Sequence, residues 1–208
     1  MSRYTGPVCR LCRAEGAKLF LKGDRCYTEK CGLTKRNSKP GQHGTRRSKM
    51  SEYGLRLREK QKLRRFYCLN ETQFSAVYVR ATNMPGQTGH NFLQLLERRL
   101  DNVVYRLGFG VSRSQARQLV RHGHFTVNGR KLDIPSALLN PGDVVAVIEG
   151  SKEMALLKEN SEAAAARAIP AWLSLNSEAM SGSVVSAPVR EQIEVPVNEQ
   201  LVVEFYAR

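Results

Sequence analysis

The clearest pattern in the sequence is a run of apolar residues at helical spacing near its middle. Leucine and valine recur there every three or four positions, at Leu93, Leu96, Leu100, Val103 and Leu107. This spacing places the apolar side chains on one face of a helix, the face that packs into a core. The pattern therefore predicts a helix over residues 92–107, ended by Gly108.

A second helix is predicted directly after the first. Ser112 is followed three positions later by Gln115, which is a capping-box pattern, and Gly123 marks the end of the helix. Within it, basic residues recur every four positions, at Arg113, Arg117 and Arg121. Because residues four apart share a helix face, the three arginines are predicted to form one basic stripe.

Short strands are predicted to follow the second helix. The dipeptide Asn128-Gly129 stands between two β-prone runs and is a strong signal for a type I′ hairpin. The run VVAVI at residues 144–148 is typical of a buried strand. Residues 92–149 are therefore predicted to form a compact α+β unit.

The remaining segments are read more coarsely. Helices are predicted at residues 51–68, 71–82 and 151–168, a loop at 181–190, and an extended pair at 191–197 and 200–206. Ser51 is expected to cap the first of these helices. Trp172, the only tryptophan, is expected to anchor the packing around it.

Charge divides the 208-residue chain into two unequal halves. The formal net charge is +14, but residues 1–100 hold 22 Lys and Arg against seven Asp and Glu, whereas residues 101–208 hold 11 against 12. The basic half is therefore predicted to bind a polyanion, most simply the phosphates of a nucleic acid. No apolar run approaches the roughly 18 residues of a membrane span, and the N-terminus lacks a signal-peptide pattern, so a cytoplasmic protein with reduced thiols is expected.

Four of the five cysteines lie in one short segment. Cys9, Cys12, Cys26 and Cys31 have the spacing C-x2-C-x13-C-x4-C, which is typical of a structural zinc site that is closed by four thiolates. An iron–sulfur cluster, disulfides and free thiols remain alternatives. The surrounding cations, which would offset the thiolate charge, are Arg10, Arg13, Lys18, Lys22, Arg25 and Lys30. Cys68 stands apart and is predicted to be a small buried residue.

A second basic region follows the cysteines. Residues 34–50 contain six Lys or Arg around Pro40 and Gly41, which predicts an irregular arm that becomes ordered on nucleic acid. In the helix that follows, Arg56, Lys60 and Arg64 lie four apart and are predicted to form a cationic stripe suited to phosphates. A solvated helix face is the alternative interpretation.

No catalytic motif accompanies these basic segments. The sequence contains no P-loop, dinucleotide-binding glycine motif, HExxH or nucleophile elbow, and its acids and bases are scattered. We considered an RNA-modifying enzyme, but too few residues remain for a separate catalytic domain. A zinc-ribbon regulator that binds duplex DNA is compatible with the cysteines and the basic arm. An RNA-binding, non-catalytic protein is the favoured hypothesis.

Several segments resemble one family. ERRLDNVVYRLGFGVSRSQARQLVRHGHFTVNG at residues 97–129 resembles the small RNA-binding module that is named after ribosomal protein S four and that also occurs in some enzymes. Residues 4–26, KPGQHG at 39–44, YGLRLREKQKLRRFY at 53–67 and residues 188–208 are similar to the bacterial ribosomal protein family itself. The four cysteines match its zinc-bearing variant.

The resemblance implies an α+β protein with two domains. A mostly helical domain with a four-cysteine zinc knuckle would comprise residues 1–91 and about 182–208. An α+β domain over residues 92–181, which contains the RNA-binding module at about 97–157, would be inserted into it.

The resemblance also implies partners and contact residues. Members of the family are structural components of the small ribosomal subunit, bind the rRNA of that subunit at a multi-helix junction and nucleate assembly of the subunit body. They also contact ribosomal protein S five and influence translational accuracy. Some members repress translation of their own mRNA. Other small-subunit proteins are further expected partners. The expected RNA contacts are Lys35, Arg36, Lys39, His43, Arg46, Arg47, Lys49, Tyr53, Arg56, Arg58, Arg65, Arg113, Gln115, Arg117, Arg121, His122 and His124.

Overall fold

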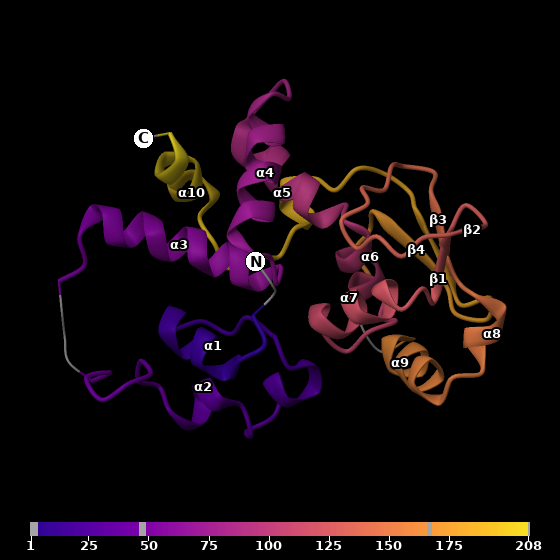
Figure 1. The fold of residues 1–208 in the computed structure, drawn as a ribbon, viewed down its shortest axis with the longest axis horizontal. Coiled ribbons are helices and arrows are strands. Elements are labelled where there is room, and N and C mark those ends of the chain that lie inside the picture. The colour runs from indigo at the N-terminus through magenta and orange to yellow at the C-terminus, as the bar shows by residue number, and fades with distance from the viewer. Residues whose placement is uncertain (1–3, 46–48, 166–167, 208) are drawn as a thin grey trace. The chain divides into compact units, whose positions relative to one another are not determined.

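The computed structural model divides the chain into two compact units (Figure 1). It describes residues 4–45, 49–165 and 168–207. The first unit comprises Met1–Phe92 together with Glu194–Arg208, and the second comprises Leu93–Ile193. The chain therefore returns to the first unit near residue 194. The predicted return near residue 182 is too early, because the residues at that position form a strand of the second unit's sheet.

The first unit is helical. Its elements are α1 (Cys9–Glu15), the 3-10 helix η1 (Gly23–Cys26), α2 (Gly32–Lys35), α3 (Glu52–Phe66), α4 (Glu71–Thr82), the start of α5 (Thr88–Glu97) and α10 (Glu199–Tyr206). The predicted cap of α3 is confirmed, because the Ser51 hydroxyl accepts a hydrogen bond from the Gly54 amide at 3.1 Å. Asn70 caps α4 in the same way, at 2.8 Å from the Gln73 amide. Both caps satisfy an amide that the first helical turn leaves without a partner.

The last element, α10, packs against α3 (Figure 1). Val202 of α10 is fully buried, as is Leu63 of α3. The predicted extended pair at 191–197 and 200–206 is therefore wrong in both members, because the first contains a 3-10 turn and the second is a helix. The Asn198 side chain starts this helix by accepting a hydrogen bond from the Gln200 amide at 3.0 Å.

An aromatic cluster joins α4, α5 and α10. Phe74 and Phe92 are fully buried, with ring centroids 4.9 Å apart in an edge-to-face arrangement. Tyr78 stacks on Tyr206 at 4.4 Å, which connects α4 to the C-terminal helix. Such aromatic pairs contribute roughly 0.5–1.5 kcal/mol beyond the area that they bury.

The second unit combines helices with one antiparallel sheet. Its elements are the rest of α5, α6 (Leu100–Arg106), α7 (Arg113–Arg121), β1 (Phe125–Val127), β2 (Arg130–Lys131), β3 (Val144–Val147), α8 (Glu149–Lys152), α9 (Ala155–Ala165), β4 (Leu173–Asn176), β5 (Ser181–Val184) and the 3-10 turn η2 (Arg190–Gln192). The strand order is β2-β1-β3-β5-β4, and every neighbouring pair is antiparallel. The predicted loop at 181–190 is wrong over β5, because its backbone pairs with both β3 and β4.

Two local predictions in this unit have different outcomes. The hairpin is confirmed, since Asn128 and Gly129 take φ values of 50° and 77°, as a type I′ turn requires. The single helix over 92–107 is wrong, because the chain is extended at Arg99, which forms a bridge to Leu138 between α5 and α6. The predicted helix at 151–168 is likewise divided, into α8 and α9.

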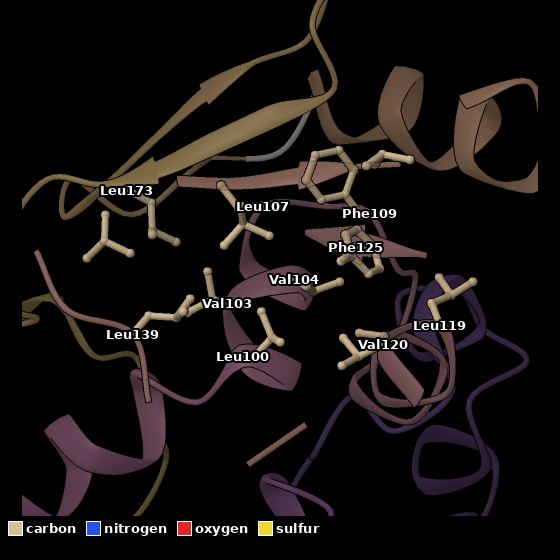
Figure 2. Close-up of a cluster of buried hydrophobic side chains, with 14 of the residues drawn as sticks. Leu100, Val103, Val104, Leu107, Phe109, Leu119, Val120, Phe125, Leu139 and Leu173 are labelled. Carbon is tan, nitrogen blue, oxygen red and sulfur yellow. The ribbon is translucent and has the colours of Figure 1, made fainter. Parts of the chain in front are cut away.

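The core of the second unit lies between the helices and the sheet. Figure 2 shows Leu100 and Val103 of α6, and Leu107 directly after this helix, among the buried side chains beneath the strands. These leucines and valines are the residues whose spacing predicted a buried face, and each is fully buried. Trp172 is 1% exposed and belongs to the same core, as expected.

A glycine of β5 allows the closest approach between helix and sheet. A Cβ atom at Gly182 would lie 2.4 Å from Leu107 Cδ2 and 3.0 Å from the Ser174 carbonyl oxygen. We expect Gly182→Ala to lower the free energy of unfolding of the second unit by about 1–3 kcal/mol, the usual cost of overpacking a core. Urea unfolding followed by Trp172 fluorescence measures this change.

Gly150 in α8 supplies the matched control. A Cβ atom there would meet nothing within 4 Å, and the residue is helical. Gly150→Ala is therefore expected to leave the stability unchanged or slightly raised. Equal stability for the two variants would show that the contact with Leu107 relaxes without cost.

In the part of the chain that the structure describes, no helix combines the length and the apolar composition that crossing a bilayer requires.

Candidate nucleic-acid interface and cysteine site

The basic arm of the first unit presents its cations to solvent. The predicted contact residues that are exposed here are Lys35, Arg36, Lys39, His43, Lys49 and Tyr53. Arg46 and Arg47 lie outside the described residues. The exposed members have no carboxylate within ion-pair distance among the described residues, so their charge is not neutralised by these acids and is open to solvent.

The cationic stripe of α3 is oriented differently from the prediction. Arg56 Nε donates to Glu204 Oε2 of α10 at 2.7 Å, and Lys60 is 5% exposed with its Nζ 2.6 Å from Glu71 Oε1. Arg64 Nε lies 3.5 Å from the other oxygen of Glu71. The prediction of an open phosphate-binding stripe is therefore wrong, because these side chains neutralise the acids that hold the C-terminal helix and α4 in place.

Glu71 is the centre of this internal network. It accepts hydrogen bonds from the Lys60 ammonium and from the Tyr206 hydroxyl, the latter at 3.0 Å. Burial by itself raises the pKa of the Glu71 carboxyl, but these two donors outweigh it and hold the pKa below its ordinary value. The Lys60 Nζ also lies 4.6 Å from the Phe205 ring centroid, a cation–π contact that further ties α3 to α10.

Arg58 and Arg65 both form ion pairs with one buried carboxylate. The Glu15 carboxylate is fully buried; it accepts a hydrogen bond from Arg65 Nη1 and lies 3.6 Å from Arg58 Nη1. Burial raises the pKa of Glu15, although the two arginines oppose the shift. Arg65 therefore serves the fold, and its contact with RNA stays a prediction.

Arg58 nevertheless reaches an open hollow of about 290 Å³. The walls of this hollow include four basic side chains and two acidic ones, Arg13, Lys39, Arg58, Lys62, Glu15 and Glu59. Both acids are already engaged by arginine or lysine. The excess of cations makes this hollow a candidate contact for an RNA phosphate.

The basic stripe of α7 is mostly turned into the protein. Arg113 is 6% exposed, and its Nε donates to Asn102 Oδ1 at 2.9 Å. Arg117 Nη1 donates to Asp101 Oδ2 at 2.7 Å. Two of the three predicted contact arginines therefore hold α7 on α6, and only Arg121, with a side chain that is 69% exposed, is open to a partner.

Gln115 also has an internal role. Its Oε1 accepts a hydrogen bond from the backbone N–H of Val111 at 2.7 Å. The backbone N–H of Gln115 donates to the Ser112 hydroxyl at 3.3 Å. The predicted capping pattern is thus present with one change, because the glutamine bonds the residue before the cap. The contact of Gln115 with RNA stays a prediction.

A basic patch remains at the end of α7 and on the adjoining hairpin. Its exposed members are Arg121, His122, Arg130 and Lys131. His124 is half-buried, with Nδ1 2.9 Å from the Ser151 hydroxyl, and its pKa is lowered by burial and then by the charges of His122 and Lys131. Sequence reasoning missed Arg130 and Lys131, although their place directly after the hairpin turn was a usable signal.

The four clustered cysteines meet around one small hollow. Cys12, Cys26 and Cys31 are buried, Cys9 is half-buried, and all four line a hollow of about 10 Å³, close to the minimum that one water molecule needs. None of the cysteines is in a disulfide. Among residues 4–45, 49–165 and 168–207, however, no three His, Cys, Asp or Glu side chains are arranged closely enough to hold a metal ion as they stand.

The surroundings of these thiols differ from those of an ordinary apolar core. Burial raises the pKa of the Cys12 thiol, and the charges of the other three cysteines raise it further. The Lys22 amide donates to Cys26 Sγ at 3.4 Å. For Cys31, burial is outweighed by hydrogen bonds from Thr34 and Leu33, which lower the pKa.

Cys68 lies apart from this cluster. It is half-buried, so its prediction as a buried residue is wrong. Its φ is 54°.

Comparison with known families decides the assignment. Residues 3–97 match the model described as the ribosomal protein S4/S9 N-terminal domain, and residues 98–145 match the S4 domain. The chain belongs to the ribosomal protein S4 family. Curated S4-family relatives named small ribosomal subunit protein uS4 are 60% identical in Pelotomaculum thermopropionicum, 58% in Thermoanaerobacter sp. and 56% in Thermodesulfovibrio yellowstonii, each over 208 residues and 100% of both chains.

The two family models follow the division of the structure. The S4 domain model begins at residue 98, close to the start of the second unit, and includes α6, α7, β1, β2 and the first two residues of β3. It ends at residue 145, inside β3, so that α8, α9 and the β4–β5 pair lie beyond it. The basic patch at the end of α7 is therefore part of the S4 domain.

Proposed function

We propose that this chain is a structural component of the small ribosomal subunit that binds the subunit's rRNA. Membership of the S4 family supports this function, as does a full-length similarity to proteins named small ribosomal subunit protein uS4. The family is structural rather than enzymatic. The observation that carries the proposal is the selective exposure of cations in the basic arm and in the patch at the end of α7.

The exposed cations fit a structured RNA. Side chains cannot read the deep major groove of an RNA helix, so folded RNA is recognised by its shape, its phosphates and its 2′-hydroxyls. Exposed cations on both units suit an RNA junction, where several RNA helices converge and each unit can bind phosphates. We therefore propose direct binding at a multi-helix junction, an early role in assembly of the subunit body, and a place in the cytoplasmic ribosome.

The family resemblance supplies the remaining proposals. A contact with ribosomal protein S five would connect this chain to translational accuracy, and binding of its own mRNA would make it a repressor of its own synthesis. A filter-binding titration against small-subunit rRNA, with large-subunit rRNA and duplex DNA as competitors, tests the central proposal. Equal competition by all three nucleic acids would overturn it.

We also propose that Cys9, Cys12, Cys26 and Cys31 hold one structural zinc ion. Four thiolates complete the coordination of zinc, so the metal would cross-link the segment and have no open position for catalysis. Their arrangement around one small hollow and the amide donated to Cys26 support the proposal. Bound zinc would deprotonate the thiols, whose pKa burial otherwise raises at Cys12 and Cys26.

The salt dependence of rRNA binding separates exposed arginines from internal ones. Arg36 is exposed, whereas Arg56 is engaged by Glu204. We expect Arg36→Ala to reduce the slope of log K against log salt by about 0.7–0.9, the value for one lost phosphate contact. Arg56→Ala is expected to leave the slope unchanged. Titrations at several salt concentrations measure both slopes, and an unchanged slope for Arg36→Ala would exclude its contact with phosphate.

A further inference from the structure

A stacked pair of aromatic rings, one exposed and one half-buried, lies in the segment between the cysteines. The rings of Phe20 and Tyr27 are stacked, with centroids 5.0 Å apart and planes inclined by 28°. Tyr27 is 66% exposed, the highest value among the exposed large hydrophobic residues that the structure describes. Two stacked rings at the surface are unusual, because aromatic side chains normally bury most of their area.

The backbone places Phe20 in this position against its own preference. Leu19 and Leu21 on either side are buried, at 0% and 7% exposed, so Phe20 is the side chain of the three that is directed outward. Its φ is 52°, in the left-handed region that bulky residues rarely adopt. Conformations of this kind persist where the surrounding structure holds them, and they gather at binding sites.

The charge around the pair is predominantly positive. The exposed cations of this segment are Arg10, Lys18, Lys22, Arg25 and Lys30, and its exposed acids are Asp24 and Glu29. Arg25 Nε donates to the Lys30 carbonyl at 3.2 Å, so the guanidinium lies over the turn that follows Tyr27. An aromatic face among cations matches the chemistry of an unpaired nucleotide, whose base stacks while its phosphate is neutralised.

We propose that Tyr27, supported from beneath by Phe20, is a stacking platform for an unpaired base of the bound RNA. The surrounding lysines and arginines would hold the phosphates on either side of that base. This inference rests on the proposed rRNA-binding function and adds to it a contact that reads an unstacked nucleotide rather than a helix. An acidic protein surface is the competing occupant, and the experiment below distinguishes the two.

The platform predicts a distinctive effect on binding. Removing a base–aromatic stack weakens binding by roughly 5- to 150-fold per base, but no phosphate contact is lost with it. Tyr27→Ala and Tyr27→Leu are therefore expected to raise the Kd for small-subunit rRNA by that factor without changing the salt slope. Tyr27→Phe keeps the ring and is expected to bind like the wild type. Tyr4→Ala, which removes a tyrosine that is 54% exposed, is the matched control and is expected to be neutral.

A spectroscopic variant tests the stack directly. Tyr27→Trp would add an exposed indole to a chain whose own tryptophan is buried in the other unit. We expect small-subunit rRNA to quench the added emission, and duplex DNA at the same concentration, which offers no unpaired base, to leave it largely unchanged. Zinc content and far-ultraviolet circular dichroism, measured for each variant, show whether the segment is still folded; if Tyr27→Ala disturbs it, the Phe, Leu and Trp variants decide.

The outcomes separate this inference from the proposed function. If the wild-type chain does not prefer small-subunit rRNA over its competitors, the proposed function fails. If the preference is present but Tyr27→Ala and Tyr27→Leu bind like the wild type, the platform is wrong and the proposed function stands. A reduced salt slope would show a phosphate contact instead of a stack. Absence of quenching in Tyr27→Trp, together with unchanged binding, would show that no base stacks on the ring and would overturn the inference.

Discussion

Replacing Asp101 by asparagine is expected to lower the free energy of unfolding of the second unit by about 3–5 kcal/mol. The Asp101 carboxylate is 5% exposed and accepts two hydrogen bonds from Arg99, at 3.1 and 2.8 Å, and one from Arg117 at 2.7 Å. Arg99 is itself only 2% exposed. Asparagine would leave this guanidinium buried beside a neutral amide, and an unpaired buried charge is costly.

The single tryptophan makes this measurement specific to one unit. Trp172 is buried in the core of the second unit, so its fluorescence in a urea titration reports the unfolding of that unit. Asp133→Asn is the matched control, because Asp133 is 55% exposed and lies 3.8 Å from an exposed Arg121. Surface pairs of this kind contribute about 0–1 kcal/mol. Equal stability for the two variants would show that Arg99 finds another partner or is hydrated.

Removing the proposed zinc ion is expected to unfold the cysteine segment and to leave the second unit intact. A structural zinc site contributes roughly 10–16 kcal/mol of apparent binding free energy, and a segment this short has few apolar side chains to replace it. All four proposed ligands lie in the first unit. A chelator should therefore release the segment from Cys9 to Lys35, while the emission of Trp172 stays unchanged.

Hydrogen exchange resolved by peptide measures the two effects in one experiment. Exchange should become fast over α1, η1 and α2 and should stay slow over α6 and α7. Cys12→Ser should purify without zinc, whereas Cys68→Ser, which alters the cysteine outside the cluster, should retain one ion per chain. Loss of both units together on chelation would contradict their independence, and wild-type chain that purifies without zinc would contradict the proposed site.

The C-terminal helix shows where sequence reasoning reaches its limit. The run QLVVEFY is rich in β-prone residues, and by local preference it was predicted to be extended. In the structure it is α10, because Asn198 caps its start and Val202 is buried in the first unit, whose α3 this helix contacts. Asn198 was a local cap signal that the sequence analysis missed. The packing partner does not follow from a local pattern, since α3 lies about 140 residues earlier in the chain.

The arginines illustrate a second limit. Their periodicity predicted correctly that Arg113 and Arg117 belong to a helix, and the apolar spacing of α6 predicted its buried face. The direction of the charged faces was predicted wrongly, because it depends on acids that folding brings close. Asp101 engages Arg117 from the neighbouring helix, and Glu204 engages Arg56 from the far end of the chain. A basic stripe therefore indicates a binding surface only after its acidic partners are known.

The return of the chain to its first unit also has a consequence for synthesis on the ribosome. Residues 1–92 emerge first, but α10, which packs against α3, is synthesised only after the whole second unit. At roughly 5–20 residues per second, the intervening segment takes some 5–20 s to translate. The second unit is contiguous and can fold within that interval. We therefore expect the second unit to fold first. The first unit would complete its fold only after α10 has been synthesised, and until then the face of α3 against which α10 packs would be exposed to solvent.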